Sequence, residues 1–475
     1  MGDETYDAIV VGAGPGGAAC AGLLAKGGMK TLLLDKNDRP GGKTLTVSRG
    51  GFTYELWPVT ANPVRNSQYE AVIRELGLEV ELVPPSPESV TLYRGPSGEY
   101  APYQLPGPVP LTQEESEEFG RFFADVTSMT PEQIDALDEV TFHEFISRYR
   151  IPQSLYSFFA MFANIAFLVP VDLVSASEAV KTWRDFMQGG ATGYFKGGFG
   201  RLAEECAEAV KRNGGEVRLR TRVERISIED GQVRGVVTDQ GAFHAPIVVS
   251  NSGIQPTVLK LVGEEHFDKG YVNYVKDLVP SMALIGIRYF LSKPVMEHPI
   301  YMTFSDDSYW NSERYLKAKA GWVPEEGFIH VVTPSVYDPS LAPAGKQCVL
   351  GSIMSPSDPE MKNTQAWWDK LDEMMAKLWP EFPQHIEHKE HYSAADVSAV
   401  ARDHVLPGQG GECIGLAQVV GQCGRHKPSA KAPLRGLFYV GCDAGGYGCG
   451  THQAVDSAFK VAHMVLQYHQ MHQVV

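Results

Sequence analysis

The first 35 residues alternate between apolar runs and a glycine-rich turn. Apolar residues dominate 6–11, glycines crowd 12–17, a helical pattern covers 18–26, and a second apolar run spans 30–35. Near-continuous apolar strands are typical of a parallel sheet covered on both faces, and about 30 residues is the usual size of a strand–helix–strand unit. We therefore predict that the chain opens with such a unit.

The same pattern returns twice after long interruptions. We predict helices over 199–211 and from Thr451, and strands over 216–228, 232–238, 245–250 and 436–440. Proline-rich loops and helical stretches at 114–125 and 131–149 occupy the first interruption. The prediction is an α/β protein: a discontinuous Rossmann-type cofactor domain (1–60, 196–255 and 411–475) with an inserted α+β substrate domain (61–195 and 256–410).

Composition narrows the classes of function. The 475 residues are 43% hydrophobic and 21% charged, as in globular enzymes, and the net charge of −15 disfavours a nucleic-acid partner. Seven scattered cysteines indicate reduced thiols, and no metal-binding spacing is visible. The start of the chain shows no secretion signal, so we expect a cytoplasmic protein. The apolar stretch 154–169 is too interrupted to span a bilayer; it is either domain core, or a substrate channel or membrane-surface contact.

The glycine turn carries the first chemistry. Its residues are Gly12, Ala13, Gly14, Pro15, Gly16 and Gly17, a G-x-G-x-x-G pattern between strand and helix. The glycines allow a tight turn, close approach of a pyrophosphate and close helix packing, and the helix N-terminus favours an anion. Asp35 ends the second strand, followed by Lys36, where a carboxylate accepts ribose hydroxyls. The alternatives are a ligand-free turn and a solvated aspartate.

The next segment places Gly41, Gly42 and Lys43 just beyond this acid. With this glycine pair the sequence resembles the phytoene desaturase and carotenoid isomerase branch of the FAD-dependent amine-oxidase-like superfamily. The resemblance implies that the loop touches the pyrophosphate of FAD. Lys43 replaces the commoner arginine, which implies a point-charge contact in place of a bidentate one.

Further segments extend the resemblance. Pro58, Val59 and Thr60 match the turn beneath the flavin ring, with Trp57 in place of a glycine; Trp57 either walls the site or is an ordinary packed side chain. Val223 is the implied adenine contact. Asp443 is the implied ribitol contact, and the implied start of the helix facing the flavin comprises Gly450, Thr451, His452 and Gln453. A helix N-terminus there stabilises negative charge on the ring.

Together these features predict a non-covalent FAD-dependent oxidoreductase of the desaturase or dehydrogenase type. We expect an apolar small-molecule substrate, a C=C bond formed or reduced by hydride transfer at flavin N5, and an electron acceptor such as oxygen or a quinone. Tyr447 and His452 are candidate proton donors or polar anchors. Cys413 is a candidate for covalent flavin attachment, but its neighbours do not match such motifs.

Three alternatives stay open. The first is a redox-neutral flavin-dependent isomerase or hydratase of a C=C bond, and the second is an FAD-dependent amine oxidase. The third is a non-enzymatic binder of prenylated proteins, like the GDP-dissociation inhibitors. The sequence leaves the substrate, the direction of hydride transfer and the oligomeric state undetermined, and peripheral membrane contact is possible.

Overall fold

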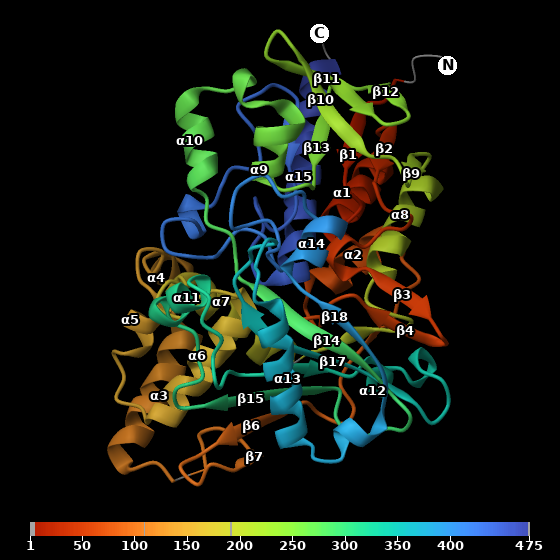
Figure 1. Ribbon diagram of the computed structural model, residues 1–475. Coiled ribbons are helices and arrows are strands. Elements are labelled where there is room, and N and C mark those ends of the chain that lie inside the picture. Colours follow the sequence, from red (N-terminus) through yellow and green to blue (C-terminus); the bar gives the residue numbers. More distant parts are fainter. Residues whose placement is uncertain (1–4, 109, 191, 474–475) are drawn as a thin grey trace.

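The computed structural model describes residues 5–108, 110–190 and 192–473 and has an upper and a lower lobe (Figure 1). Residues 1–4 of the predicted cofactor domain and Val109 of a proline-rich loop lie outside the described residues. The first and last parts of the described chain both belong to the upper lobe (Figure 1).

A five-stranded parallel sheet forms the centre of the upper lobe. Its strands, in spatial order, are β19 (Leu437–Tyr439), β13 (Val248–Ser250), β1 (Ala8–Val11), β2 (Thr31–Leu34) and β9 (Glu216–Arg218). All residues of the first four are buried, as expected when helices cover both faces. The sheet confirms a Rossmann-type α/β fold assembled from distant segments; the domain boundaries stay a prediction.

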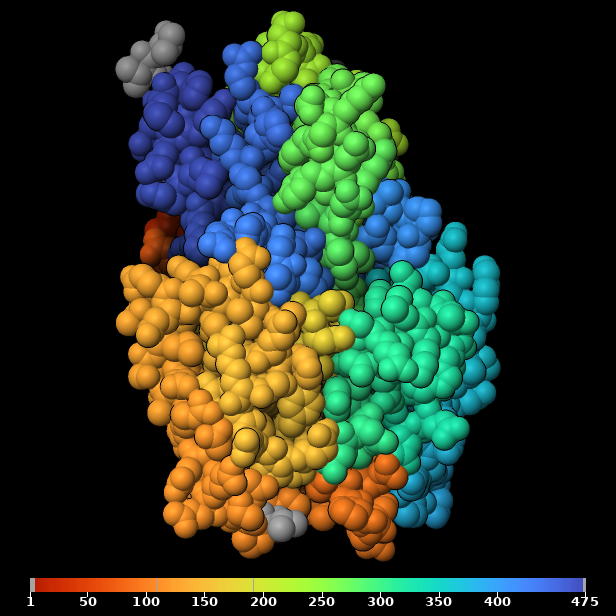
Figure 2. Space-filling model, turned by 90° about the vertical axis from the view of Figure 1, so that its left-hand side faces the viewer, coloured from red at the N-terminus to blue at the C-terminus, as the bar shows by residue number. Residues whose placement is uncertain are grey.

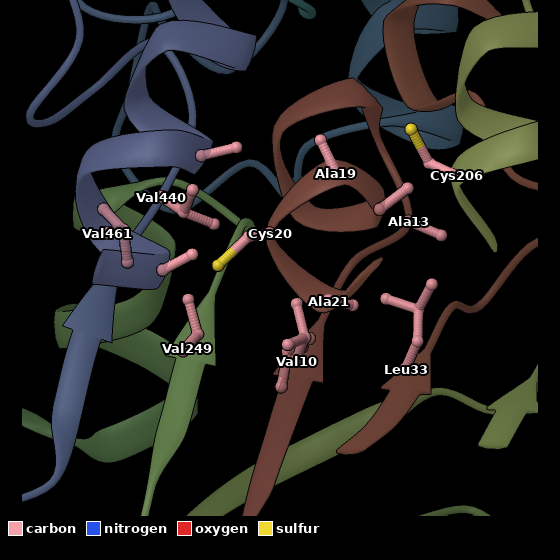
Figure 3. Packing of buried hydrophobic residues seen from close by; sticks show 14 of the residues in the cluster. Val10, Ala13, Ala19, Cys20, Ala21, Leu33, Cys206, Val249, Val440 and Val461 are labelled. Carbon is pink, nitrogen blue, oxygen red and sulfur yellow. The ribbon is translucent and has the colours of Figure 1, made fainter. Parts of the chain in front are cut away.

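Helix α1 (Pro15–Lys26) packs against α8 (Arg201–Arg212) and α15 (Gly450–Gln473). Figure 3 shows Cys20 of α1 near Val440 and Val461 of the C-terminal segment, with Cys206 of α8 on the other side of α1. Small side chains let these elements approach closely. A Cβ at Gly17 would lie 2.0 Å from the carbonyl oxygen of Gly12, so only glycine fits there.

The predicted single strand over 216–228 is wrong. The chain forms β9 and then a separate strand, β10 (Val223–Glu229), which joins an antiparallel sheet with β11 (Gln232–Thr238) and β12 (Gly241–His244). The break has a local cause: the N–H groups of Arg220 and Thr221 donate to the carbonyl oxygens of Asn37 and Asp35, and Arg220 has a φ of 52°. These bonds turn the chain out of the parallel sheet.

The lower lobe is built on a seven-stranded mixed sheet. In spatial order its strands are β18 (Ile386–Tyr392), β14 (Ala283–Leu291), β17 (Gln347–Ser355), β16 (His330–Val332), β15 (Ile300–Ser305), β6 (Val90–Arg94) and β7 (Tyr100–Pro102). Helix α13 (Thr364–Leu378) packs against β14 and β17.

Five helices stand beside this sheet: α3 (Gln113–Ser128), α4 (Pro131–Asp135), α5 (Phe142–Ile146), α6 (Gln153–Phe167) and α7 (Ala176–Gly189). The helical stretch expected over 131–149 is two short helices, because Thr141 and Glu144 form a new capping box at the start of α5. Helix α6 is the apolar stretch 154–169. No helix among the described residues is long and apolar enough to cross a membrane.

The remaining helices and strands are shorter. They are β3 (Thr46–Arg49), β4 (Phe52–Glu55), α2 (Gln68–Leu76), β5 (Leu82–Val83), β8 (Tyr194–Phe195), α9 (Ile254–Pro256) with its π-helical continuation Thr257–Val262, α10 (Lys269–Asp277), α11 (Ser312–Lys319), α12 (Pro334–Tyr337) and α14 (Ala394–Val400). In Figure 2 the blue chain around residue 420 lies between the upper lobe and the orange helices below. Backbone bridges join Val419 to Val174 and Leu416 to Pro280 there.

Candidate active site

One cavity of about 340 Å³ is lined by residues from both lobes. The upper lobe contributes the turn after β1, the end of β2 and the loop before α15. The lower lobe contributes α6, α7 and the strands β14 to β16. The cavity therefore joins a nucleotide-like pocket to an apolar one.

The glycine turn forms the floor of the upper-lobe part of the cavity. Its residues Gly12, Gly14, Pro15 and Gly16 line the cavity, whereas Ala13 and Gly17 lie behind them. Gly12 has a φ of 97°, which favours glycine. A Cβ at Gly14 would lie 2.8 Å from Nδ2 of Asn251, so the turn is a narrow cradle.

Asp35 is held beside this cradle by the backbone. Its Oδ2 accepts from the N–H of Ala13 at 2.7 Å, and its Oδ1 accepts from the N–H of Asn37 at 2.8 Å. Burial raises the pKa of Asp35, while these two N–H groups oppose that rise. Each oxygen retains a lone pair, so the carboxylate is able to accept two ribose hydroxyls.

Next to Asp35, three cations surround one carboxylate. Lys260, Lys36 and Arg222 lie 2.6, 3.2 and 3.5 Å from the oxygens of Asp403. Burial disfavours the charge on Asp403, but the hydrogen bond from Lys260 and the charge of Lys36 lower its pKa to about 2. Val223 follows Arg222 on the same wall, at the start of β10.

The glycine pair closes over the cradle from the other side. The N–H of Gly41 donates to the carbonyl oxygen of Ala13 at 2.9 Å, and a Cβ at Gly42 would lie 3.2 Å from Cα of Gly14. Gly42 and Lys43 line the cavity, and Gly41 does not. Lys43 is half-buried, and its charge reaches Asp443.

Asp443 lines the cavity but is already strongly bonded. Its two oxygens accept from the N–H groups of Ile254 and Leu416 at 2.9 and 3.1 Å and from the guanidinium of Arg402 at 3.0 and 3.2 Å. Burial opposes its ionisation, yet the charge of Arg402 and the N–H of Ile254 lower the pKa of Asp443. A ribitol hydroxyl would have to share an acceptor site with Arg402.

The start of α15 reaches the cavity only in part. Gly450 and Thr451 line it, together with Pro58, Val59 and Thr60 from the turn after β4. Gln453 does not; its Nε2 donates to the carbonyl oxygen of Cys442 at 3.0 Å.

His452 and Tyr447, the two residues suggested for proton transfer, do not line the cavity. His452 is buried behind the helix start, where its Nε2 accepts from the N–H of Gln68 at 3.2 Å. Tyr447 lies near Asp185, and burial raises its pKa to about 12. Neither side chain is therefore placed to contact a substrate in the cavity.

The lower-lobe part of the cavity wall, together with the turn after β4, is called the apolar compartment, and its side chains are uncharged. Its helix and loop residues are Trp57, Asn62, Phe162, Ile165, Ala166, Leu168, Phe186 and Thr192, and its strand residues are Leu284, Ile300, Met302 and His330. Helix α6 is thus both a packed core element and a cavity wall. Trp57 likewise packs beside Tyr392 and Val397 and lines the cavity.

Three cysteines line the cavity, namely Cys413, Cys442 and Cys449. The Sγ of Cys413 accepts from the N–H of Leu284 at 3.2 Å, and that of Cys442 donates to the carbonyl oxygen of Gly450 at 3.2 Å. Burial raises the pKa of the Cys413 and Cys442 thiols to about 11. A protonated thiol is a weak nucleophile, which favours non-covalent binding of a cofactor.

Sequence patterns did not reveal Asn251, Arg402 or His330. Asn251 follows β13, at the same sheet edge as the glycine turn, and that position at the end of an apolar run was an available signal. Arg402 lies in a loop after α14 and has no local pattern. His330 stands at the start of a short apolar strand.

Comparisons with known proteins agree with this geometry. A family profile described as flavin containing amine oxidoreductase matches residues 16–466. A 4,4'-diapophytoene desaturase from Methylomonas sp is 23% identical and covers 78% of each chain. A chloroplastic prolycopene isomerase from Daucus carota is 25% identical over 81% of this chain and 68% of its own. The crystal structure of an oxidoreductase from Methanosarcina mazei has the same fold, with a TM-score of 0.74, 19% identity and coverage of 96% and 99%.

Proposed function

Because the chain belongs to the flavin-containing amine oxidoreductase family and is an FAD-dependent oxidoreductase, we propose that it forms or reduces a C=C bond in an apolar small molecule. The observation that carries the proposal is the continuous cavity, which joins the glycine cradle to the apolar compartment. Bound FAD supplies hydride acceptance or donation at N5. The protein supplies binding, orientation and exclusion of water.

The cradle fits the pyrophosphate of FAD because Gly14 and Gly42 line the cavity with bare backbone, and a Cβ on either would crowd Asn251 or Gly14. We propose that Asp35 binds the adenosine ribose and Val223 the adenine, and that Lys43 contacts the pyrophosphate. Pro58, Val59 and Thr60, with Gly450 and Thr451, would then border the flavin ring. In this arrangement Asp443 acts mainly by holding Arg402 on the cavity wall.

The charges of the cavity favour carbon–carbon over carbon–nitrogen chemistry. Its lining carboxylates are Asp35, Asp403 and Asp443, and each is bonded to backbone N–H groups or to cations. A protonated amine in the apolar compartment would therefore lack a free counter-ion, which is costly in a buried site. The related desaturase and isomerase are named for carotenoids, which agrees with an apolar substrate.

The remaining partners belong to the same proposal. Oxygen or a quinone would reoxidise the flavin, since the sequence shows no second strand–glycine–helix unit for a nicotinamide cofactor. We propose a cytoplasmic protein that reaches apolar substrates by peripheral membrane contact. Bleaching of the flavin by NADH or NADPH faster than by substrates would contradict the proposed acceptor.

The visible spectrum of the purified protein tests the cofactor. A flavin band near ~450 nm, with all colour released into the small-molecule fraction on denaturation, is the expected result. Absence of the band after reconstitution with FAD would contradict the proposal and favour a non-enzymatic prenyl-protein binder.

Anaerobic mixing tests the chemistry. Apolar alkanes, polyenes and cyclic ketones should reduce the bound flavin, or reoxidise it after reduction, whereas primary amines should not. Product formation that needs reduced flavin, without any change in the oxidation state of the product, would instead identify the redox-neutral isomerase, which the relative from Daucus carota favours.

A further inference from the structure

His330 is a buried polar side chain in a compartment of apolar ones. It is 7% exposed and lies on β16 directly opposite Met302 of β15. Ile300 is two residues from Met302, so all three lie on the same face of the sheet. This face forms one wall of the apolar compartment.

Neither ring nitrogen of His330 has a hydrogen bond with any described residue. Nδ1 is sealed from solvent, so Nε2 is the nitrogen that a ligand in the cavity can reach. Two exposed histidines, in contrast, are bonded through Nδ1: that of His298 lies 2.7 Å from the carbonyl oxygen of Glu88, and that of His143 lies 2.7 Å from the hydroxyl of Tyr156. Buried polar groups in native proteins are rarely left without a partner, so a ligand is the natural partner for His330.

The backbone around His330 is fixed. Its carbonyl oxygen accepts from the hydroxyl of Ser352 at 3.0 Å on the neighbouring strand, so the ring is presented by a rigid sheet. Burial lowers the pKa of His330 to about 4, which keeps the imidazole neutral near pH 7. A neutral imidazole offers one donor and one acceptor, and this pair suits a hydroxyl or carbonyl group better than a charged one.

We infer that His330 is a substrate-binding residue that bonds a hydroxyl or carbonyl oxygen on an otherwise apolar substrate. This inference rests on the proposed function and narrows its substrate class: an oxygen-bearing apolar molecule binds better than a pure hydrocarbon. A site built to bond an oxygen discriminates strongly against an analogue that lacks it, because its own polar group is then left unpaired.

Matched ligand pairs test the inference on the FAD-loaded protein. The pairs are geraniol with the hydrocarbon that lacks only its hydroxyl, and 4-phenyl-1-butanol with butylbenzene. Affinity is measured by the ligand-induced rise in Tm and by perturbation of the flavin spectrum. We expect the wild type to bind the alcohol at least tenfold more tightly than the hydrocarbon in one pair or both.

Two variants at this position make the result specific. The ring of His330 makes no hydrogen bond within the protein, so His330→Phe breaks none and should fold. It should reduce the preference for the alcohol to less than threefold. His330→Gln, which keeps a donor and an acceptor, should retain most of it. Met302→Leu changes the shape of the same wall without changing its polarity, so it should alter both affinities by the same factor.

A wild type with flavin bound that shows no preference in either pair would overturn the inference, as would a preference that persists in His330→Phe. Both results leave the flavin spectrum intact, so they differ from failure of the proposed function, in which the protein binds no flavin.

Discussion

Asp35 and His330 both line the cavity, but they differ in how many of their polar side-chain atoms are bonded to the protein. The carboxylate of Asp35 accepts hydrogen bonds from the N–H groups of Ala13 and Asn37, and each of its oxygens keeps a lone pair for a ligand. The imidazole ring of His330 has no hydrogen-bond partner among the described residues. Asp35 therefore stabilises the folded turn and, in the proposed function, the bound cofactor as well, whereas the ring of His330 is retained at some expense of stability.

Asp35→Asn should weaken FAD binding by about 10- to 100-fold, since hydrogen bonds to a charged group contribute about 1.5–3 kcal/mol. The amide has only one oxygen, so one of the two backbone N–H groups also loses its acceptor. Titration of apoprotein with FAD, followed by flavin fluorescence, measures the change. Asp38→Asn, on the exposed side of the same turn, is the control and should leave the affinity unchanged.

His330 should make the protein sensitive to acid. Its pKa is about 4 in the folded chain and 6.5 ordinarily, so the unfolded chain binds more protons between these values. The free energy of unfolding therefore falls as the pH drops from 6.5 to 4, by about 2 kcal/mol at pH 5. His330→Phe should remove this loss in urea denaturation at pH 7 and pH 5. The exposed His463→Gln should behave like the wild type, and an equal loss in His330→Phe would contradict the assignment.

At the scale of elements, a buried ion pair ties the loop after α14 to the turn after β19. The side chain of Arg402 is 7% exposed and lies 2.7 Å from Glu412 and 3.0 Å from Asp443. The backbone N–H groups of Ile254 and Leu416 add to this cluster. The cluster joins segments more than 180 residues apart, and it positions the cavity wall on that side.

Arg402→Met should destabilise the protein by about 3–5 kcal/mol, because it leaves two buried carboxylates without their cation. The matched control is Arg222→Met, which removes an ion pair of 3.5 Å from a guanidinium that is 45% exposed. Exposed pairs contribute at most about 1 kcal/mol. Chemical denaturation of both variants measures the difference. Similar small losses would show that the cluster is not an important stabilising contact.

At the scale of the molecule, one ligand in the cavity should stabilise both lobes, because both contribute to its wall. FAD at about 100 times its Kd should stabilise the folded state by about 2.7 kcal/mol. Since both lobes line the cavity, FAD should slow amide exchange not only in the glycine turn but also in β14 and β15. Hydrogen exchange with and without FAD measures this effect. Helix α3, which does not line the cavity, is the internal control; protection confined to the upper lobe would contradict the coupling.

Short patterns in the sequence predicted many residues that line the proposed cofactor site, because these residues act through local backbone geometry. The glycine turn, Asp35 and the glycine pair occupy about 30 consecutive residues, and their roles follow from a strand, a tight turn and a helix. Apolar runs identified the strands of the parallel sheet for the same reason. The strand break at 220–221 was missed because its cause, hydrogen bonding to residues 35 and 37, is distant in sequence.

The sequence by itself determined the dinucleotide fold, the flavin family and the glycine cradle, because these depend on neighbours along the chain. Only the tertiary structure decided which side chains share the cavity. In the folded protein Arg402 occupies acceptor sites of Asp443. Tyr447 and His452 do not line the cavity, whereas His330 and α6 line the apolar compartment. Sheet register and the packing of the two lobes bring side chains from distant strands together there. A local sequence pattern does not predict such long-range contacts.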